Sequence, residues 1–222
     1  MFILLFAIEF AFLFFLARRL INALSTLFFR ITRSEKVTVI LLSCVFFPGT
    51  IVHELAHLLA AGLLFVGTGR MELTPKIIEK GVILGSVEIE KTDVLRRAVI
   101  GVAPVLVGIT IIFGTLFYLQ TLIAVNLIIY LAALIIIFEV GNTLFSSKKD
   151  LEGTLEFLAS SLVLAVAVFI IKPEILHNLL WLFHRKEIVN LFRNADDFLV
   201  APVLIDLICI LITKIITGKK LA

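Results

Sequence analysis

Two histidines and a glutamate stand inside the otherwise apolar stretch PGTIVHELAHLLAAG, residues 48–62. His53 and His57 are four residues apart, so on a helix their imidazoles share one face, about 6 Å apart, and can reach one zinc ion. Glu54 can then act as general base toward a water that the metal activates, and can return the proton to the leaving amine. This H-E-x-x-H pattern predicts the Zn2+ centre of a zinc peptidase. The alternative is that the three residues are ordinary polar contacts between packed helices.

A third zinc ligand must come from elsewhere in the chain, because catalytic zinc sites usually have three protein ligands and one open position. Glu79 would match the zinc peptidases whose third ligand is a glutamate. It belongs, however, to the turn-like sequence Glu79-Lys80-Gly81, which we expect at the surface, away from a motif inside an apolar helix. The acidic candidates downstream of the motif are Glu72, Glu79, Glu88, Glu139, Asp150 and Asp206.

The composition is that of a membrane protein. Of the 222 residues, 61% are hydrophobic, and the mean hydropathy of +1.15 is far above the range of soluble domains. The net charge of +3 is modest, and the basic residues form short clusters between apolar runs. That pattern suits loops at lipid headgroups and argues against nucleic-acid binding. Cys44 and Cys209 lie in separate apolar segments and indicate neither a Cys-x-x-Cys pair nor a disulfide framework.

Long apolar runs predict the helices that cross the bilayer. A spanning helix needs roughly 20 apolar residues, because the hydrocarbon layer is about 30 Å thick and each residue rises about 1.5 Å. The first run has neither a preceding basic stretch nor a cleavage site, so we expect a retained membrane segment. We therefore expect an all-α multi-pass membrane protein with about six transmembrane helices. The runs are residues 1–17, 37–66, 97–119, 121–146, 154–171 and 199–217.

No linker or internal repeat divides the chain, so we expect a single membrane-embedded domain over residues 1–222. Its core should cover about 37–153, with peripheral helices over 1–36 and 154–222. Residues 173–198 are expected to form a polar-faced helix with its tryptophan at the membrane interface.

Two further details concern the N-terminal third of the chain. Pro48 and Gly49 interrupt the second run, where a helix should break or kink, so we expect a short piece over 37–47 and a separate helix from residue 50 to 66. Residues 20–33 are expected to form an interfacial amphipathic helix, or else to continue the first span.

The segment of about residues 67–96 has a different pattern. Apolar and polar residues alternate in RMELT and again in SVEIE, and glycine and proline punctuate the stretch. We therefore expect a small β-hairpin or sheet of two to four short strands, inserted after the H-E-x-x-H helix and lying at the membrane surface.

Together these features resemble the site-2 protease family of intramembrane zinc metalloproteases. The likeness consists of H-E-x-x-H in a predicted span, a β-rich segment next, and two tightly connected spans that end in Asn and Asp. The second motif of that family is N-x-x-P-x-x-x-x-D-G. Asn142 and Asp150 keep its spacing, with Phe145 at the proline position and Leu151 at the final glycine position. The resemblance covers about residues 48–153 and implies that Asp150 is the third zinc ligand and that Asn142 contacts the substrate or steadies the site.

These polar residues also have structural interpretations. Asp150 could belong to a capping box at the start of the next span. Asn142 could make a hydrogen bond between helices. Glu139 could be a second-shell partner of a histidine, a packing residue or a pore-facing residue. For Asp206, an intramembrane ion pair with Lys214 or a water contact is a better prediction than zinc.

The expected function is that of an intramembrane zinc metalloendopeptidase. Zinc held by His53, His57 and Asp150 would activate water, with Glu54 as base, against a membrane-protein substrate in the lipid bilayer. A slight excess of basic residues on one side predicts a cell-membrane protein whose active site lies nearer the cytoplasm. The alternative is a non-proteolytic membrane scaffold or transporter with a structural or vestigial zinc site, in which Glu54 would have no role as a base.

Overall fold

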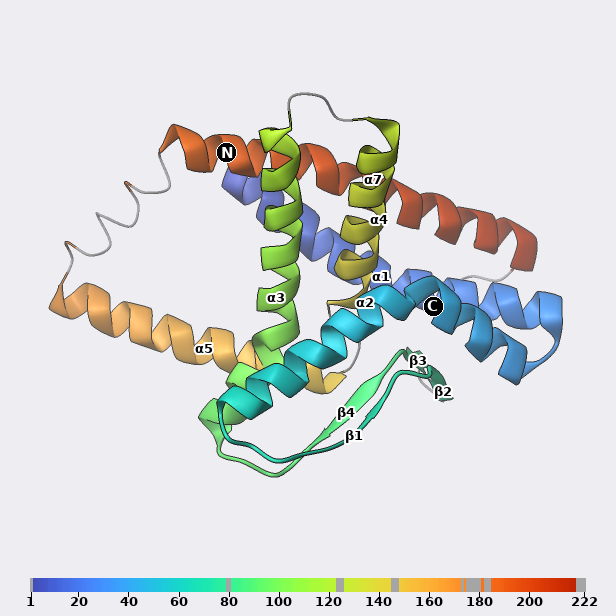
Figure 1. The fold of residues 1–222 in the computed structure, drawn as a ribbon, viewed down its shortest axis with the longest axis horizontal. Helices are drawn as coiled ribbons and strands as arrows, with labels where there is room; N and C mark the ends of the chain where they lie inside the picture. Colours follow the sequence, from blue (N-terminus) through green and yellow to red (C-terminus); the bar gives the residue numbers. More distant parts are fainter. Residues whose placement is uncertain are drawn as a thin grey trace.

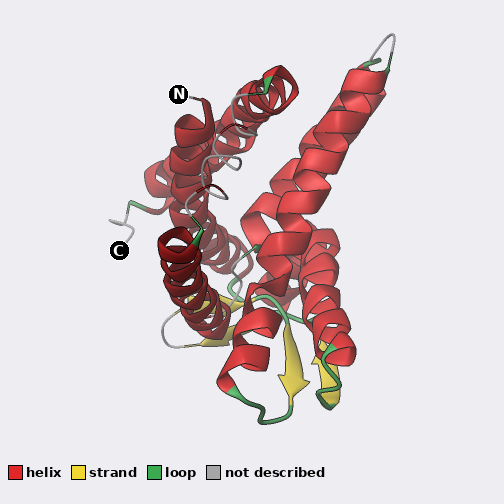
Figure 2. Ribbon diagram, turned by 90° about the vertical axis from the view of Figure 1, so that its left-hand side faces the viewer, coloured by secondary structure: helices red, strands yellow, loops and turns green. Residues whose placement is uncertain are grey.

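The computed structural model is mostly helical and describes residues 2–78, 81–122, 126–144, 148–172, 174, 181 and 185–218 (Figures 1 and 2). A small β-segment stands between the second and third helices. The helices are α1 (Phe2–Thr32), α2 (Glu35–Leu63), α3 (Val94–Thr121), α4 (Leu127–Thr143), α5 (Lys148–Ile171) and α7 (Lys186–Thr217). The strands are β1 (Thr68–Glu72), β2 (Lys76–Ile78), β3 (Gly81–Ile83) and β4 (Ser86–Ile89).

Four described helices are long and apolar enough to cross a membrane, namely Ala11–Thr32, Glu35–Leu63, Val94–Thr121 and Leu199–Thr217. The other two predicted spans correspond to shorter apolar helices, Leu127–Thr143 and Ala159–Ile171. The expected class, a helical membrane protein with a small β insertion, agrees with this architecture, whereas the count of six spans does not follow from it.

Two predicted helix boundaries can be compared with the structure. Residues 20–32 continue α1, which was one of the two interpretations of the stretch 20–33, because the chain holds no breaker there. At the other end, α7 runs without interruption from Lys186 to Thr217 and joins the second half of the predicted helix 173–198 to the last span. Most of the first half of that predicted helix, His177 and His184 included, lies outside the described residues.

The helix α2 runs continuously through Pro48, so the predicted division after residue 47 is wrong. Proline removes one backbone hydrogen bond and crowds the carbonyl of the preceding turn, but the long segments on either side keep the helix intact. Figure 1 shows the helix changing direction between its blue and cyan parts. At its start, the Ser34 hydroxyl accepts a hydrogen bond from the Val37 N–H, at 3.4 Å, and caps the first turn.

The helices α1 and α7 lie side by side and run in the same direction (Figure 1). Near their starts, the rings of Phe6 and Phe192 meet edge to face, with centroids 5.3 Å apart. Near their ends, the Arg30 guanidinium donates a hydrogen bond to the carbonyl oxygen of Thr217. These two contacts fix a parallel register along the whole length of both helices.

The helices α3 and α4 form an upright antiparallel pair (Figure 1). Each begins at a side chain that caps its first turn: Asp93 accepts from the Arg96 N–H at 3.0 Å, and Asn126 accepts from the Ile129 N–H at 2.9 Å. The Arg96 N–H also lowers the pKa of the Asp93 carboxyl, because the hydrogen bond favours its charged form. Figure 2 shows this pair reaching away from the end of the molecule where the strands lie.

The β-segment consists of two antiparallel pairs, β1 with β4 and β2 with β3, as the alternating pattern predicts. The strands run back along α2 (Figure 1). Ile89 packs near Ala61 at the end of α2, whereas Leu84 is fully buried in a cluster with Phe46, near the middle of that helix. The segment therefore reaches the level of the H-E-x-x-H motif.

The helices α2 and α4 come very close to each other at Gly49. A Cβ atom added to Gly49 would lie 2.5 Å from the Glu139 carbonyl oxygen and 2.6 Å from the Thr143 hydroxyl oxygen. The Gly49 N–H donates a hydrogen bond to the Glu139 carboxylate, at 3.3 Å between N and Oε2. Only a residue without a side chain allows this approach.

We predict that Gly49→Ala lowers the free energy of unfolding by about 1–3 kcal/mol, because a methyl group would push the two backbones apart. Gly62→Ala is the matched control on the same helix, since nothing lies within 4 Å of its added Cβ, and it should be neutral or slightly stabilising. Thermal unfolding of the two variants in detergent measures the difference. Equal stability of both variants would contradict the crossing at Gly49.

Candidate metal centre

The helix α2 places the two histidines of the motif together on a buried face. His53 is 3% exposed, His57 is 6% exposed, and Glu54 between them is 2% exposed. The imidazole centroids of His53 and His57 are 4.9 Å apart, with the ring planes at 82°. Two imidazoles at this separation on one helix face can both direct a nitrogen to a single ion, as the spacing of the motif predicts.

The helix α3 fixes the orientation and tautomer of His57. The His57 Nδ1–H donates a hydrogen bond to the carbonyl oxygen of Ile100, at 2.9 Å. A carbonyl oxygen can only accept, so Nδ1 carries the proton and Nε2 keeps the lone pair that a metal needs. A backbone carbonyl is a common second partner of metal-binding histidines. Ile100 is itself held in place, because it is buried in a cluster with Ala61 and Val66.

The turn between β3 and β4 packs directly against the predicted base. A Cβ atom added to Gly85 would lie 2.7 Å from Thr50 Cγ2 and 2.9 Å from Glu54 Oε1. The preceding residue, Leu84, is fully buried and anchors the turn. The sign of this contact in the sequence is weak, a glycine between two short strands, because a close approach to a helix 31 residues earlier has no local pattern.

The structure places Glu139, on α4, beside Gly49 of the motif helix, which lies one turn before His53. Glu139 is 7% exposed, and its carboxylate accepts the hydrogen bond from Gly49 N–H described above. Its described hydrogen bond is thus to the backbone of the helix that carries His53. This contact between two helices matches the packing interpretation of Glu139.

Asn142 and Asp206, from α4 and α7, are bonded to each other inside the protein. The Asn142 amide nitrogen donates to Asp206 Oδ1 at 3.2 Å. This contact matches the interhelical hydrogen bond that was one of the two interpretations of Asn142. The predicted ion pair of Asp206 with Lys214 is wrong in the described structure. Lys214 is exposed and lies two turns further along the same helix, whereas Asp206 is buried and accepts from Asn142.

The two main candidates for a third zinc ligand, Asp150 and Glu79, fall outside the described side chains. Asp150 stands in the first turn of α5, but its side chain is not described, and Glu79 lies in the undescribed residues 79–80. Among the side chains that the structure does describe, no three His, Cys, Asp or Glu residues could share one metal ion. The third ligand therefore stays a prediction, with Asp150 and Glu79 as its candidates.

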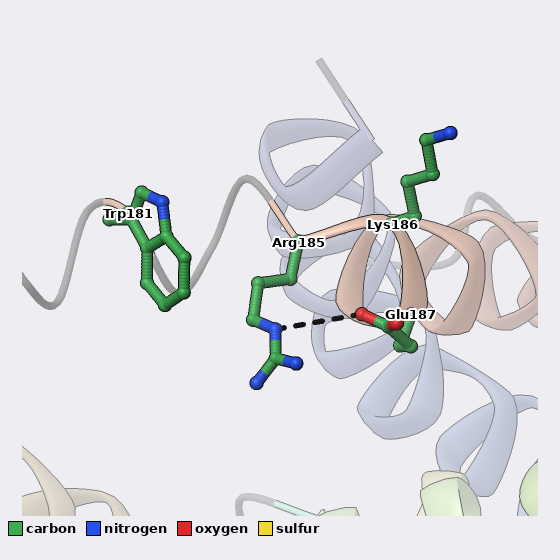
Figure 3. A pocket seen from close by; sticks show the side chains of 4 residues that line it. All are labelled: Trp181, Arg185, Lys186 and Glu187. Carbon is green, nitrogen blue, oxygen red and sulfur yellow. Dashed lines mark ion pairs between the residues drawn. The ribbon is translucent and has the colours of Figure 1, made fainter.

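A surface pocket at the start of α7 shares no residue with this centre (Figure 3). It is lined by Trp181, Arg185, Lys186 and Glu187. The Arg185 guanidinium lies 5.7 Å from the Trp181 ring centroid, and its Nε lies 3.7 Å from Glu187 Oε2. An exposed tryptophan beside basic side chains suits the interface between membrane and water, as expected for Trp181.

Comparisons of the chain with protein-family models, curated proteins and solved structures find no match.

We predict that Gly85→Ala destabilises the protein by about 1–3 kcal/mol, because the added methyl group would overlap Thr50 and Glu54. Thr50→Ser removes the nearest methyl group, so the double variant Thr50→Ser/Gly85→Ala should recover part of the loss. Gly114→Ala, in α3, is the control, since its added Cβ meets nothing within 4 Å. Thermal unfolding of the wild type, Thr50→Ser, Gly85→Ala and the double variant provides the cycle. Purely additive effects of the Thr50 and Gly85 changes would mean that the turn does not contact α2 there.

Proposed function

We propose that the protein is an intramembrane zinc metalloendopeptidase, which hydrolyses peptide bonds in or next to the transmembrane segments of other membrane proteins. The observation that carries the proposal is the buried His53–His57 pair, 4.9 Å apart, with Glu54 between them on an apolar helix. Buried ionisable groups in a membrane segment are costly and are usually kept for function. The resemblance to the site-2 protease family supports the same assignment.

The chain offers the kinds of donor that zinc prefers. His53 and His57 would each bind the ion through one imidazole nitrogen, and for His57 this is Nε2, because Nδ1 is bonded to Ile100. Asp150 is the proposed third ligand, and Glu79 is the alternative. When bound, zinc supplies a Lewis acid that makes water nucleophilic near neutral pH.

Glu54 is the proposed general base. It directly follows a proposed ligand, so its carboxylate stands beside the reacting groups and can take a proton from the attacking water. The same carboxyl group then gives the proton to the leaving nitrogen. Glu54 is 2% exposed, and the Gly85 turn packs against it, which restricts the carboxylate to a small region. A base held in place in this way loses little conformational entropy during the reaction.

The position of the motif supports cleavage inside the membrane. Glu54 precedes Leu63, the last residue of α2, by nine residues, or roughly 14 Å along the helix. This is about half the thickness of the hydrocarbon layer. A substrate helix would have to unwind there, because its backbone groups are bonded within the helix. We place the protein in the cell membrane with the site nearer the cytoplasm, from the excess of basic residues on the side of the β-segment.

We predict that Glu54→Gln retains zinc and loses cleavage by roughly 10²–10⁴-fold, because glutamine cannot take up the proton. His53→Ala should lose the metal as well as the activity. Metal analysis of the purified protein and release of fluorescent peptides from labelled casein, an unfolded chain, measure the two properties. In the alternative function, that of a scaffold or transporter with a structural zinc site, wild type and Glu54→Gln would bind zinc equally and neither would cleave.

The third ligand can be tested separately. We predict that Asp150→Ala gives up its zinc to a chelator concentration that leaves Glu79→Ala and the wild type loaded, because a catalytic site needs three protein ligands to hold the ion. Chelator titration followed by metal analysis measures the order of loss. The reverse order would assign the third position to Glu79 and would leave the roles of His53, Glu54 and His57 unchanged.

A further inference from the structure

Asp206 and Asn142 form a buried polar link between α7 and α4. Asp206 is 0% exposed and Asn142 is 2% exposed. The Asn142 Nδ2 donates one hydrogen bond to Asp206 Oδ1, at 3.2 Å, and a second to the Phe138 carbonyl oxygen, at 3.1 Å. Both hydrogens of the amide are therefore in use.

These two bonds determine which way the Asn142 amide faces. Both of its partners are oxygens that serve as acceptors, so turning the amide over would place its own oxygen against two acceptors. The Phe138 carbonyl belongs to the same helix as Asn142, so a hydrogen bond to it alone would leave the Asn142 side chain partly free to rotate. The bond across to Asp206 fixes the second hydrogen, and with it the direction of Asn142 Oδ1.

Two acceptor oxygens at this link remain without a donor. Within the described part of the chain, Asn142 Oδ1 and Asp206 Oδ2 are both buried and receive no hydrogen bond. A buried acceptor left in this state is unfavourable, and most such groups in proteins are paired. A ligand with N–H or O–H groups would satisfy them, and an unwound peptide carries such groups along its backbone.

The link includes α4, the helix that crosses the motif helix one turn before His53. Asn142 follows Glu139 by one turn of α4, and the Glu139 carboxylate accepts from Gly49, one turn before His53 on α2. The amide oxygen of Asn142 is therefore carried by the helix that crosses the motif helix beside the ligands.

We infer that Asp206 is a positioning residue of this centre, which holds Asn142 so that its Oδ1 accepts a hydrogen bond from a backbone N–H of an extended substrate. The inference rests on the proposed zinc peptidase. The ligand that it requires is a peptide backbone, recognised by its N–H donor and not by its side chains.

Two hydroxamates distinguish binding to the zinc ion from binding to the proposed peptide site. Acetohydroxamic acid carries the zinc-binding group alone, whereas a Leu-Leu dipeptide hydroxamate also presents peptide backbone N–H groups. Asp206→Leu should weaken the dipeptide compound about three- to tenfold, the value of one hydrogen bond, and leave acetohydroxamic acid unchanged. Calorimetric titration of the zinc-loaded protein in detergent measures both affinities.

Matched variants show whether Asp206 acts through Asn142. Asn142→Leu should cause the same loss as Asp206→Leu, and the double variant should lose no more than either alone. Asp206→Asn keeps an acceptor for the amide and should retain most of the affinity. Thr213→Val is the control, because Thr213 is equally buried on α7 but donates within its own helix, to the Cys209 carbonyl.

The inference is overturned if Asp206→Leu and Asn142→Leu leave the dipeptide affinity unchanged, as a water-filled site would, if they weaken both hydroxamates equally, or if their effects add. If Asp206→Leu does not fold, the dipeptide affinities of Asn142→Leu and Asp206→Asn test the inference instead. Wild-type protein that binds neither compound would refute the zinc peptidase, and the inference with it.

Discussion

The crossing of α2 and α4 at Gly49 is the contact on which the arrangement of the candidate centre depends. Pro48 disturbs the backbone hydrogen bonding of α2, and in a membrane an unpaired backbone group costs several kcal/mol. The Glu139 carboxylate accepts from the Gly49 N–H at this point, and the missing side chain of Gly49 lets the two backbones meet. The same contact sets the position of α4, and so the place where Asn142 reaches α7.

The candidate centre is assembled from elements that are separate in the sequence. The motif helix supplies both histidines and Glu54, α3 supplies the Ile100 carbonyl that orients His57, and the β-segment supplies the turn that touches Glu54. Each of these contacts holds a side chain in one orientation. Two of these contacts are supported by hydrophobic clusters, one around Ile100 and one around Leu84. Apolar packing therefore indirectly positions the polar groups.

The sequence was sufficient for features that depend on local pattern. The spacing of His53 and His57 predicted their shared face, and the alternation around residues 67–96 predicted strands. It was not sufficient for contacts made by groups without a distinctive side chain, such as the Ile100 carbonyl or the backbone at Gly85. The predicted break at Pro48 was wrong because a local disturbance was weighed without the long helical segments on both sides. The partner of Asp206 was missed for a related reason, since Asn142 is 64 residues away in the chain.

The parallel register of α1 and α7 constrains the topology through parity. Contacts at both ends, Phe6 with Phe192 and Arg30 with Thr217, show that the two helices point the same way. Each passage through a bilayer reverses the direction of the chain, so two parallel spans are separated by an odd number of passages. If the four long helices cross the membrane, α2 and α3 already make two of these. An odd number of further passages must then lie between α3 and α7, and α4 and α5 supply it if one of them crosses and the other does not.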